Sequence, residues 1–282
     1  MKNFVNAVAE FFKLETAGGI PLVGAAAFAS LVAGCSVDSA FLYYPRPYGP
    51  GDEEAIAARH PEAQAFVLMR PDGVRLHGWL TGHLDGGGNR PLTLYFGGNA
   101  EETSWLLDNA RHFPGRVFLF MNYRGYGGSG GAPHENVLLD DALAVYDEAV
   151  KRAGIDTARV SVWGRSLGTG IAIHVATERP VSAAVLVSPY DSMDALARRH
   201  MPVLSALLSQ RYDSIGRAPG ARAPALMLAG GRDTLIPPEH SARLRSAWGG
   251  PARLVTLPEA DHNSISSDAE YWHEIMQFLR SR

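Results

Sequence analysis

The 282-residue chain contains a single cysteine, Cys35, so it cannot form an internal disulfide bond or a metal site built from several cysteines. Neither sign of charge dominates, because 26 Lys and Arg face 29 Asp and Glu, and this balance provides no basic footprint for nucleic acid. The ten histidines form no HExxH or HxH pattern. We therefore predict no metal, no cofactor and no nucleic-acid partner. What the chain does contain is 46% apolar residues, enough for a sizeable core.

The N-terminal part of the sequence resembles a targeting segment. Residues 17–37 carry no charge and include V-A-G-C, which resembles the lipobox of bacterial lipoproteins, where the cysteine receives lipid. Cys35 would then be the lipid anchor. An uncleaved membrane anchor and a buried helix are the alternatives. We predict a signal or anchor over 1–37, a tether and lead-in over 38–63 (Pro-rich over 38–50), and attachment to a membrane of the bacterial cell envelope rather than a cytoplasmic location.

From residue 64 onward, short apolar runs alternate with segments of helical periodicity. Strands are predicted at 65–70, 74–80, 92–96, 116–123, 159–163, 183–188, 224–230 and 252–257, and helices at 101–112, 134–154, 167–179, 238–248 and 268–281. This alternation predicts one α/β domain over 64–282, with a mostly parallel sheet of about eight strands and helices on both faces. An insert at about 190–223 is predicted to form a small cap, whose apolar residues either line an acyl pocket or pack on the core.

The motif G-R-S-L-G, residues 164–168, follows a predicted strand and precedes a predicted helix. In this setting a sharp turn exposes the hydroxyl of Ser166, and glycines on both sides avoid Cβ clashes. The bare motif is weak in a glycine-rich chain, but its position between strand and helix is specific. Ser166 is therefore the predicted nucleophile, unless it serves only as a helix N-cap.

Two partners for Ser166 follow strands in the order acid, then histidine. Asp233 lies just after the strand at 224–230, and His262 just after the last strand, so parallel strands would bring both to one edge of the sheet. The histidine would act as general base and the aspartate would orient it. Asp191 is a rival acid. His240, predicted on a helix and at the surface, is a weaker candidate base.

The same pattern predicts the roles of further residues near this edge. The backbone N–H groups of Asn99 and Leu167 are the predicted oxyanion hole, because the glycines before Asn99 allow close approach of the backbone. Residues 125–130 match G-x-G-x-x-G, but no acid ends the following strand, so we interpret them as a Gly-rich loop near the active edge rather than a dinucleotide site. Asp140 and Asp141 are predicted on the solvated side of a helix.

Five stretches in this order carry a family resemblance: YFGGNA, NYRGYGGSGG, WGRSLG, GGRDTLIP and ADHNSI. Over about 64–282 the chain resembles the α/β-hydrolase superfamily, in the branch of membrane-tethered depalmitoylase-like and serine-aminopeptidase-like hydrolases. That branch often has His-Gly-Asn in the oxyanion loop, and Gly97 replaces the histidine here. The resemblance implies a serine hydrolase.

The function expected from these residues is cleavage of a carboxylic ester or thioester of a small acyl substrate through an acyl-enzyme intermediate. A peptidase acting on short peptides is the first alternative, because Asp191, Asp194 and Asp213 could hold a free amine. A non-catalytic binding protein on the same fold is the second.

Overall fold

The computed structural model describes residues 42–82, 88–200, 205, 209–280 and 282. The predicted targeting segment and Cys35 lie outside these residues. One eight-stranded sheet runs through the described chain in the order β1-β2-β4-β3-β5-β6-β7-β8. Its strands are β1 (Ala63–Met69), β2 (Arg75–Thr81), β3 (Arg90–Phe96), β4 (Val117–Asn122), β5 (Ile155–Arg165), β6 (Ala183–Val187), β7 (Ala225–Gly230) and β8 (Ala252–Leu257).

The sheet is mostly parallel, as predicted. β1 pairs with β2, and β2 with β4, in antiparallel fashion, while all later pairings are parallel. The carboxyl ends of β3 to β8 consequently share one edge, where ligands bind in open α/β sheets.

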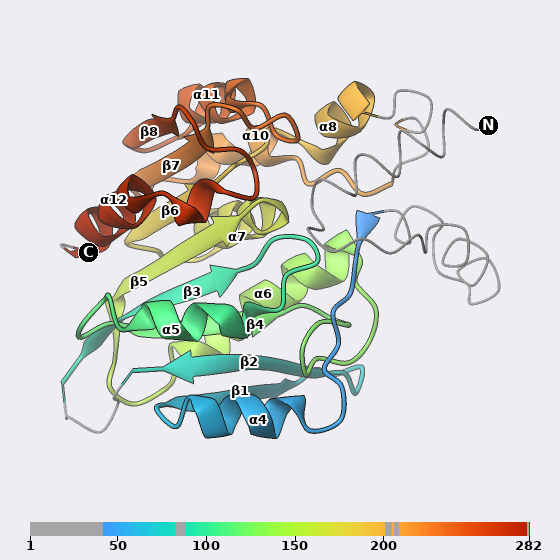
Figure 1. Cartoon of the computed structure of the whole chain (residues 1–282), viewed down its shortest axis with the longest axis vertical. Coiled ribbons are helices and arrows are strands. Elements are labelled where there is room, and N and C mark those ends of the chain that lie inside the picture. The colour runs from blue at the N-terminus through green and yellow to red at the C-terminus, as the bar shows by residue number, and fades with distance from the viewer. Residues whose placement is uncertain (1–41, 83–87, 201–204, 206–208, 281) are drawn as a thin grey trace.

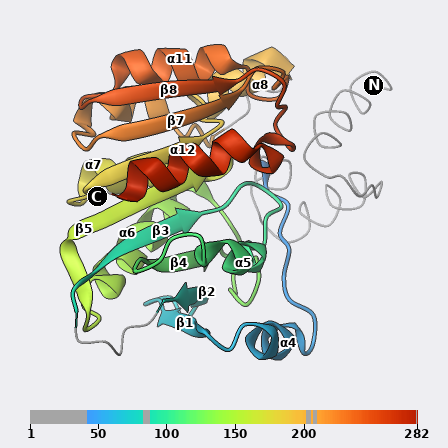
Figure 2. The same cartoon turned by 60° about the vertical axis from the view of Figure 1, so that its left-hand side comes forward.

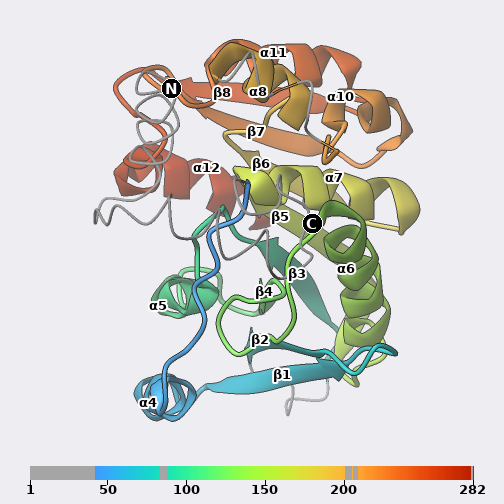
Figure 3. The ribbon, with the colours of Figure 1, turned by 90° about the vertical axis from the view of Figure 1, so that its right-hand side faces the viewer.

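Helices cover both faces of the sheet. The helical elements are α4 (Asp52–Arg59), η1 (Thr103–Leu106), α5 (Leu107–Ala110), α6 (Glu135–Ala149), α7 (Leu167–Glu178), α8 (Met193–His200), α10 (Ser214–Arg217), η2 (Ala218–Gly220), α11 (Pro238–Ala247), η3 (Ile265–Ser267) and α12 (Ala269–Arg280). Figure 3 shows α6, α7 and α11 on one face, and Figure 2 shows α12 lying across the other, which α5 also covers. In the described part of the chain, no helix is long and apolar enough to cross a membrane.

The core follows the two-residue periodicity of the strands. In β4, Val117, Leu119 and Met121 join the cluster under α6 and α7, whereas Phe118 and Phe120 join the cluster under α12. A central strand of a parallel sheet is buried on both faces, so its sequence is continuously apolar.

Several predicted elements differ from the structure. The segment predicted as a helix at 101–112 is the 3₁₀ helix η1 followed by the single turn of α5. Glu102 caps the start of η1, where its side chain accepts a hydrogen bond from the amide of Ser104. α6 ends at Ala149 rather than 154, and β5 begins at Ile155 rather than 159. The segment 42–48, predicted as part of the tether, packs on the domain, with Leu42 and Tyr43 buried.

Candidate active site

Ser166 lies at the sharp turn between β5 and α7. Its backbone has φ 49° and ψ −118°, a conformation that non-glycine residues rarely adopt, and it is 3% exposed. A Cβ on Gly164 would lie 2.4 Å from the carbonyl oxygen of Gly168, and a Cβ on Gly168 would lie 2.0 Å from the carbonyl oxygen of Phe96. Both glycines are thus required for the close approach of α7 to the sheet.

The structure brings together the three side chains that the sequence had assigned to a triad. Nε2 of His262 lies 3.1 Å from Oγ of Ser166, and Nδ1 of His262 lies 2.8 Å from Oδ2 of Asp233. All three residues are buried. Oδ1 of Asp233 accepts hydrogen bonds from the amides of Leu235 and Ile236, which fix the carboxylate in the turn after β7. This arrangement can move a proton from the serine hydroxyl to the imidazole.

The rival acid has a separate histidine. Oδ1 of Asp191 lies 2.7 Å from Nδ1 of His240, and Oδ2 accepts from Nε of Arg243 at 2.8 Å. Burial would raise the pKa of Asp191, but the hydrogen bonds and charges of His240 and Arg243 outweigh it and lower the pKa to about 2. The prediction that His240 is a surface residue is wrong: it is 4% exposed, because its helix turns it toward Asp191. Asp261, beside His262, is exposed and accepts from amides of its own turn.

The two predicted oxyanion donors border the same pocket as Ser166. Leu167 is the first residue of α7, so its N–H has no acceptor within the helix, and the helix N-terminus adds a positive field there. The pocket is narrow and mostly apolar, with a cavity volume of about 30 Å³, and its lining residues are Leu42, Asn99, Ser166, Leu167, Tyr190, Met193, Leu196, Leu235 and Ile236. Two of these, Met193 and Leu196, come from the predicted cap insert.

Arg165, at the variable position of the serine motif, connects the two loops that flank Ser166. Its Nη1 donates to Oε2 of Glu101 at 3.2 Å, and its Nη2 donates to the carbonyl oxygen of His262 at 3.1 Å. The same Glu101 oxygen accepts from the amide of Gly98 in the oxyanion loop. Gly97, which replaces the family's histidine, lies against Glu101, where a Cβ would come within 3.2 Å of its carboxyl carbon. The contacts of Arg165 and Glu101 were not predicted from the sequence, since neither residue type by itself signals a tertiary contact.

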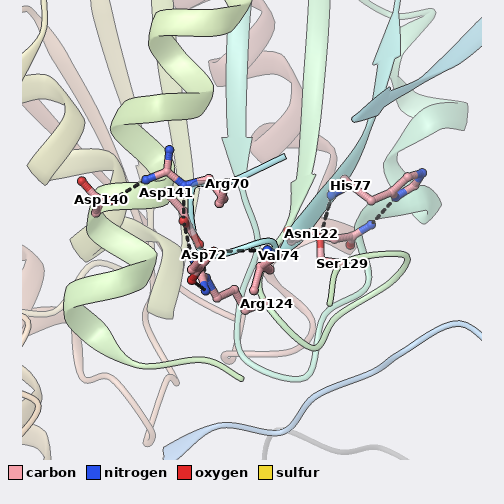
Figure 4. Close-up of polar contacts among 9 residues, drawn as sticks. All are labelled: Arg70, Asp72, Val74, His77, Asn122, Arg124, Ser129, Asp140 and Asp141. Atoms are coloured by element: carbon pink, nitrogen blue, oxygen red, sulfur yellow. Dashed lines mark hydrogen bonds and ion pairs between the residues drawn. The ribbon is translucent and has the colours of Figure 1, made fainter. Parts of the chain in front are cut away.

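The Gly-rich loop at 125–130 contacts the predicted oxyanion loop, residues 96–100. The hydroxyl of Tyr126 donates to Oδ1 of Asn99 at 2.8 Å. Figure 4 shows how the start of this loop is fixed: Arg124 and Arg70 both donate to Asp141. The prediction of a solvated Asp141 is therefore wrong, since it is 5% exposed between two guanidinium groups, while its neighbour Asp140 is exposed and pairs with Arg70. Among the described residues, no group of three or more His, Cys, Asp or Glu could hold a metal ion.

The fold and this site define an α/β hydrolase, and comparison with known proteins agrees. The chain is 36% identical over 226 residues to the protein Rv2307c of Mycobacterium tuberculosis, covering 79% of each chain. It is 29% identical over 238 residues to the α/β-hydrolase domain-containing protein WAV2 of Arabidopsis thaliana, covering 75% of this chain and 77% of that one. The chain belongs to the α/β-hydrolase superfamily.

Within that superfamily, the profile of the serine aminopeptidase S33 family matches residues 92–217. Among solved structures, an esterase of Pyrococcus furiosus superposes with a TM-score of 0.67 at 18% identity, covering 85% of this chain and 97% of that one. An acetyl xylan esterase of Thermoanaerobacterium superposes with a TM-score of 0.59 at 18% identity, covering 84% and 95%. At 18% identity, these two structures show that the fold is shared and nothing more.

Proposed function

We propose that the protein is a serine hydrolase that cleaves carboxylic esters or thioesters through an acyl-enzyme intermediate. The observation that carries the proposal is the chain of contacts from Ser166 to His262 to Asp233, at 3.1 and 2.8 Å, with Ser166 lining an apolar pocket. These distances are within hydrogen-bonding reach, as a nucleophile and its general base require.

In the proposed reaction, Oγ of Ser166 attacks the substrate carbonyl carbon and Nε2 of His262 takes the hydroxyl proton. The negative charge on the resulting oxygen is stabilised by the backbone N–H groups of Asn99 and Leu167. When the tetrahedral intermediate collapses, the protonated histidine gives its proton to the leaving oxygen or sulfur. Water, deprotonated by His262, then attacks the acyl-enzyme and releases the acid. Asp233 holds the tautomer and stabilises the imidazolium.

A peptidase is the second candidate, favoured by the match to the serine aminopeptidase profile. The acids that would hold a peptide's free amine have other partners: Asp191 binds His240 and Arg243, Asp213 accepts from the amide of Gly216, and Asp194 pairs with Arg198. The apolar pocket also suits an acyl chain better than a charged amine. We therefore place esters and thioesters first.

The test is hydrolysis of p-nitrophenyl esters of two to eight carbons, beside aminoacyl-p-nitroanilides, by wild type and Ser166→Ala. We expect ester turnover that Ser166→Ala abolishes, and Asp233→Asn to lower kcat by about 10⁴-fold, as loss of the correct histidine tautomer does in other serine hydrolases. Faster turnover of the anilides would establish the peptidase. If a fluorophosphonate probe failed to label folded protein, a non-catalytic binding role would replace both.

We also propose that the N-terminal segment attaches the protein to a membrane through lipid on Cys35, on the strength of the V-A-G-C sequence. Cys35→Ala should then move the protein from the membrane to the soluble fraction after cell lysis. An unchanged membrane fraction would favour an uncleaved helix anchor.

A further inference from the structure

A short segment ahead of the sheet crosses the edge where the strands end. We call residues 42–48 the strap. In Figures 1 and 3 it runs along this edge from the level of α7 toward α4. Two backbone hydrogen bonds fasten it to the Gly-rich loop: the amide of Gly127 donates to the carbonyl oxygen of Arg46 at 2.7 Å, and the amide of Tyr48 donates to the carbonyl oxygen of Gly127 at 2.9 Å.

The start of the strap is bound by the side chain of the oxyanion-loop residue. Nδ2 of Asn99 donates to the carbonyl oxygen of Leu42 at 2.7 Å, and Oδ1 of Asn99 accepts from the amide of Tyr44 at 3.0 Å. The hydroxyl of Tyr43 donates to Oε1 of Gln210 at 2.6 Å and lies 2.6 Å from the hydroxyl of Tyr212, both in the 190–223 insert. The strap is thus fixed between the oxyanion loop and the insert.

The side chain of Leu42 is held in the wall of the pocket that contains Ser166. It is only 9% exposed, and the wall around it is formed by Met193 and Leu196 of α8 and by Leu235 and Ile236 of the Asp233 turn. A pocket this narrow and apolar distinguishes acyl chains by how many methylene groups it can bury. A residue that enters from the strap rather than from the catalytic loops can change that length without moving the triad.

We propose that Leu42 is a specificity-determining residue that limits the length of the acyl chain, and that the Asn99 side chain positions it. This inference rests on the proposed ester hydrolase activity. It makes the residues that follow the predicted membrane attachment a physical part of the active site. Enlarging the wall at Leu42 should admit longer chains, while a bulkier side chain should exclude them.

The experiment compares kcat/KM for p-nitrophenyl acetate, butyrate and octanoate in the full-length protein and its variants. Each methylene that becomes buried is worth about a fourfold gain, so we expect Leu42→Ala to raise the octanoate-to-acetate ratio about tenfold. Leu42→Phe, which keeps the strap apolar, should lower the same ratio. Leu244→Ala is the matched control, because Leu244 is fully buried on α11 and does not line this pocket.

The outcomes separate this inference from the proposed function. Opposite shifts in the two Leu42 variants, with an unchanged ratio in Leu244→Ala, would support the assignment even if Leu42→Ala is less stable. Ser166-dependent hydrolysis with the same chain-length profile in both Leu42 variants would overturn the assignment and leave the hydrolase intact. If wild type showed no Ser166-dependent ester hydrolysis, the proposed function would fail and this inference with it.

Discussion

Arg165 offers a direct test of whether one side chain holds both loops around the proposed nucleophile. Arg165→Met removes the hydrogen bonds from the guanidinium to Glu101 and to the carbonyl oxygen of His262 while keeping most of the apolar stem. The pair is well buried, with side-chain exposures of 15% for Arg165 and 7% for Glu101. The loop that contains Asn99 and the loop that contains His262 would therefore lose their common partner in one substitution.

The size of the effect follows from what remains around the carboxylate. Removing one member of a buried ion pair costs about 3–5 kcal/mol. Glu101 keeps three donors, namely the amide of Gly98, the hydroxyl of Tyr95 and Nε1 of Trp105. Burial and the nearby Glu101 charge raise the pKa of Tyr95, so its hydroxyl stays protonated as a donor. We therefore expect a loss of about 2–3 kcal/mol in unfolding free energy.

Urea unfolding measures this loss, and p-nitrophenyl butyrate hydrolysis measures the effect on the site, where we expect kcat to fall about tenfold through misplacement of both loops. Arg159→Met is the matched control, since its pair with Asp156 is more exposed and should cost under about 1 kcal/mol. In the double variant with Glu101→Gln, part of the stability should return because no buried charge is left unpaired. Equal losses at Arg165 and Arg159 would refute the reasoning.

Three further predictions concern the surroundings of the site. Gly168→Ala should cost about 2–3 kcal/mol in urea unfolding, because its Cβ would meet the carbonyl oxygen of Phe96 at 2.0 Å; a neutral result would contradict the close approach of α7. Because the pKa of Asp191 is lowered from 3.8 to about 2, wild type should lose about 2 kcal/mol as pH falls from 4 through 2. Asp191→Asn should be less stable than wild type at pH 7 and should not show this loss of stability at low pH. The same pH dependence in both proteins would show that Asp191 does not cause the loss. Tyr126→Phe removes the hydrogen bond to the oxyanion-loop amide side chain and should lower kcat severalfold with little change in KM; a change confined to KM would argue for substrate contact instead.

Much of the fold was predictable because the pattern was local. The strands predicted at 116–123 and 224–230 form as β4 and β7, which are almost wholly apolar, buried and inside the sheet rather than at its edges. The strands predicted at 65–70 and 74–80 form as β1 and β2, which pair in antiparallel register. Helix boundaries were less accurate, since the end of α6 and the short turns near 103–110 depend on capping and packing that periodicity does not report.

The candidate triad could be proposed from sequence because each residue follows a strand, and parallel strands bring their carboxyl ends to one edge. Strand position alone favoured Asp233 over Asp191, although both acids follow neighbouring strands. In the structure each acid has its own histidine, because His240 contacts Asp191 and His262 contacts Asp233. The burial of His240 could not be predicted from the sequence of its helix, because its partner Asp191 lies in another segment of the chain.

By itself, the sequence determined the class of fold, the strand order along the chain and the residues able to form a serine-histidine-aspartate site, because these depend on local periodicity and motif position. Only the tertiary structure decided which side chains join that site from a distance. Arg165 binds Glu101, 64 residues away, and Asn99 holds the strap at Leu42, 57 residues away. Leu42 itself lines the pocket together with residues from much later in the chain, such as Ser166 and Ile236. Such contacts arise from the packing of the sheet and its loops, which brings together groups whose sequence neighbours give no sign of one another.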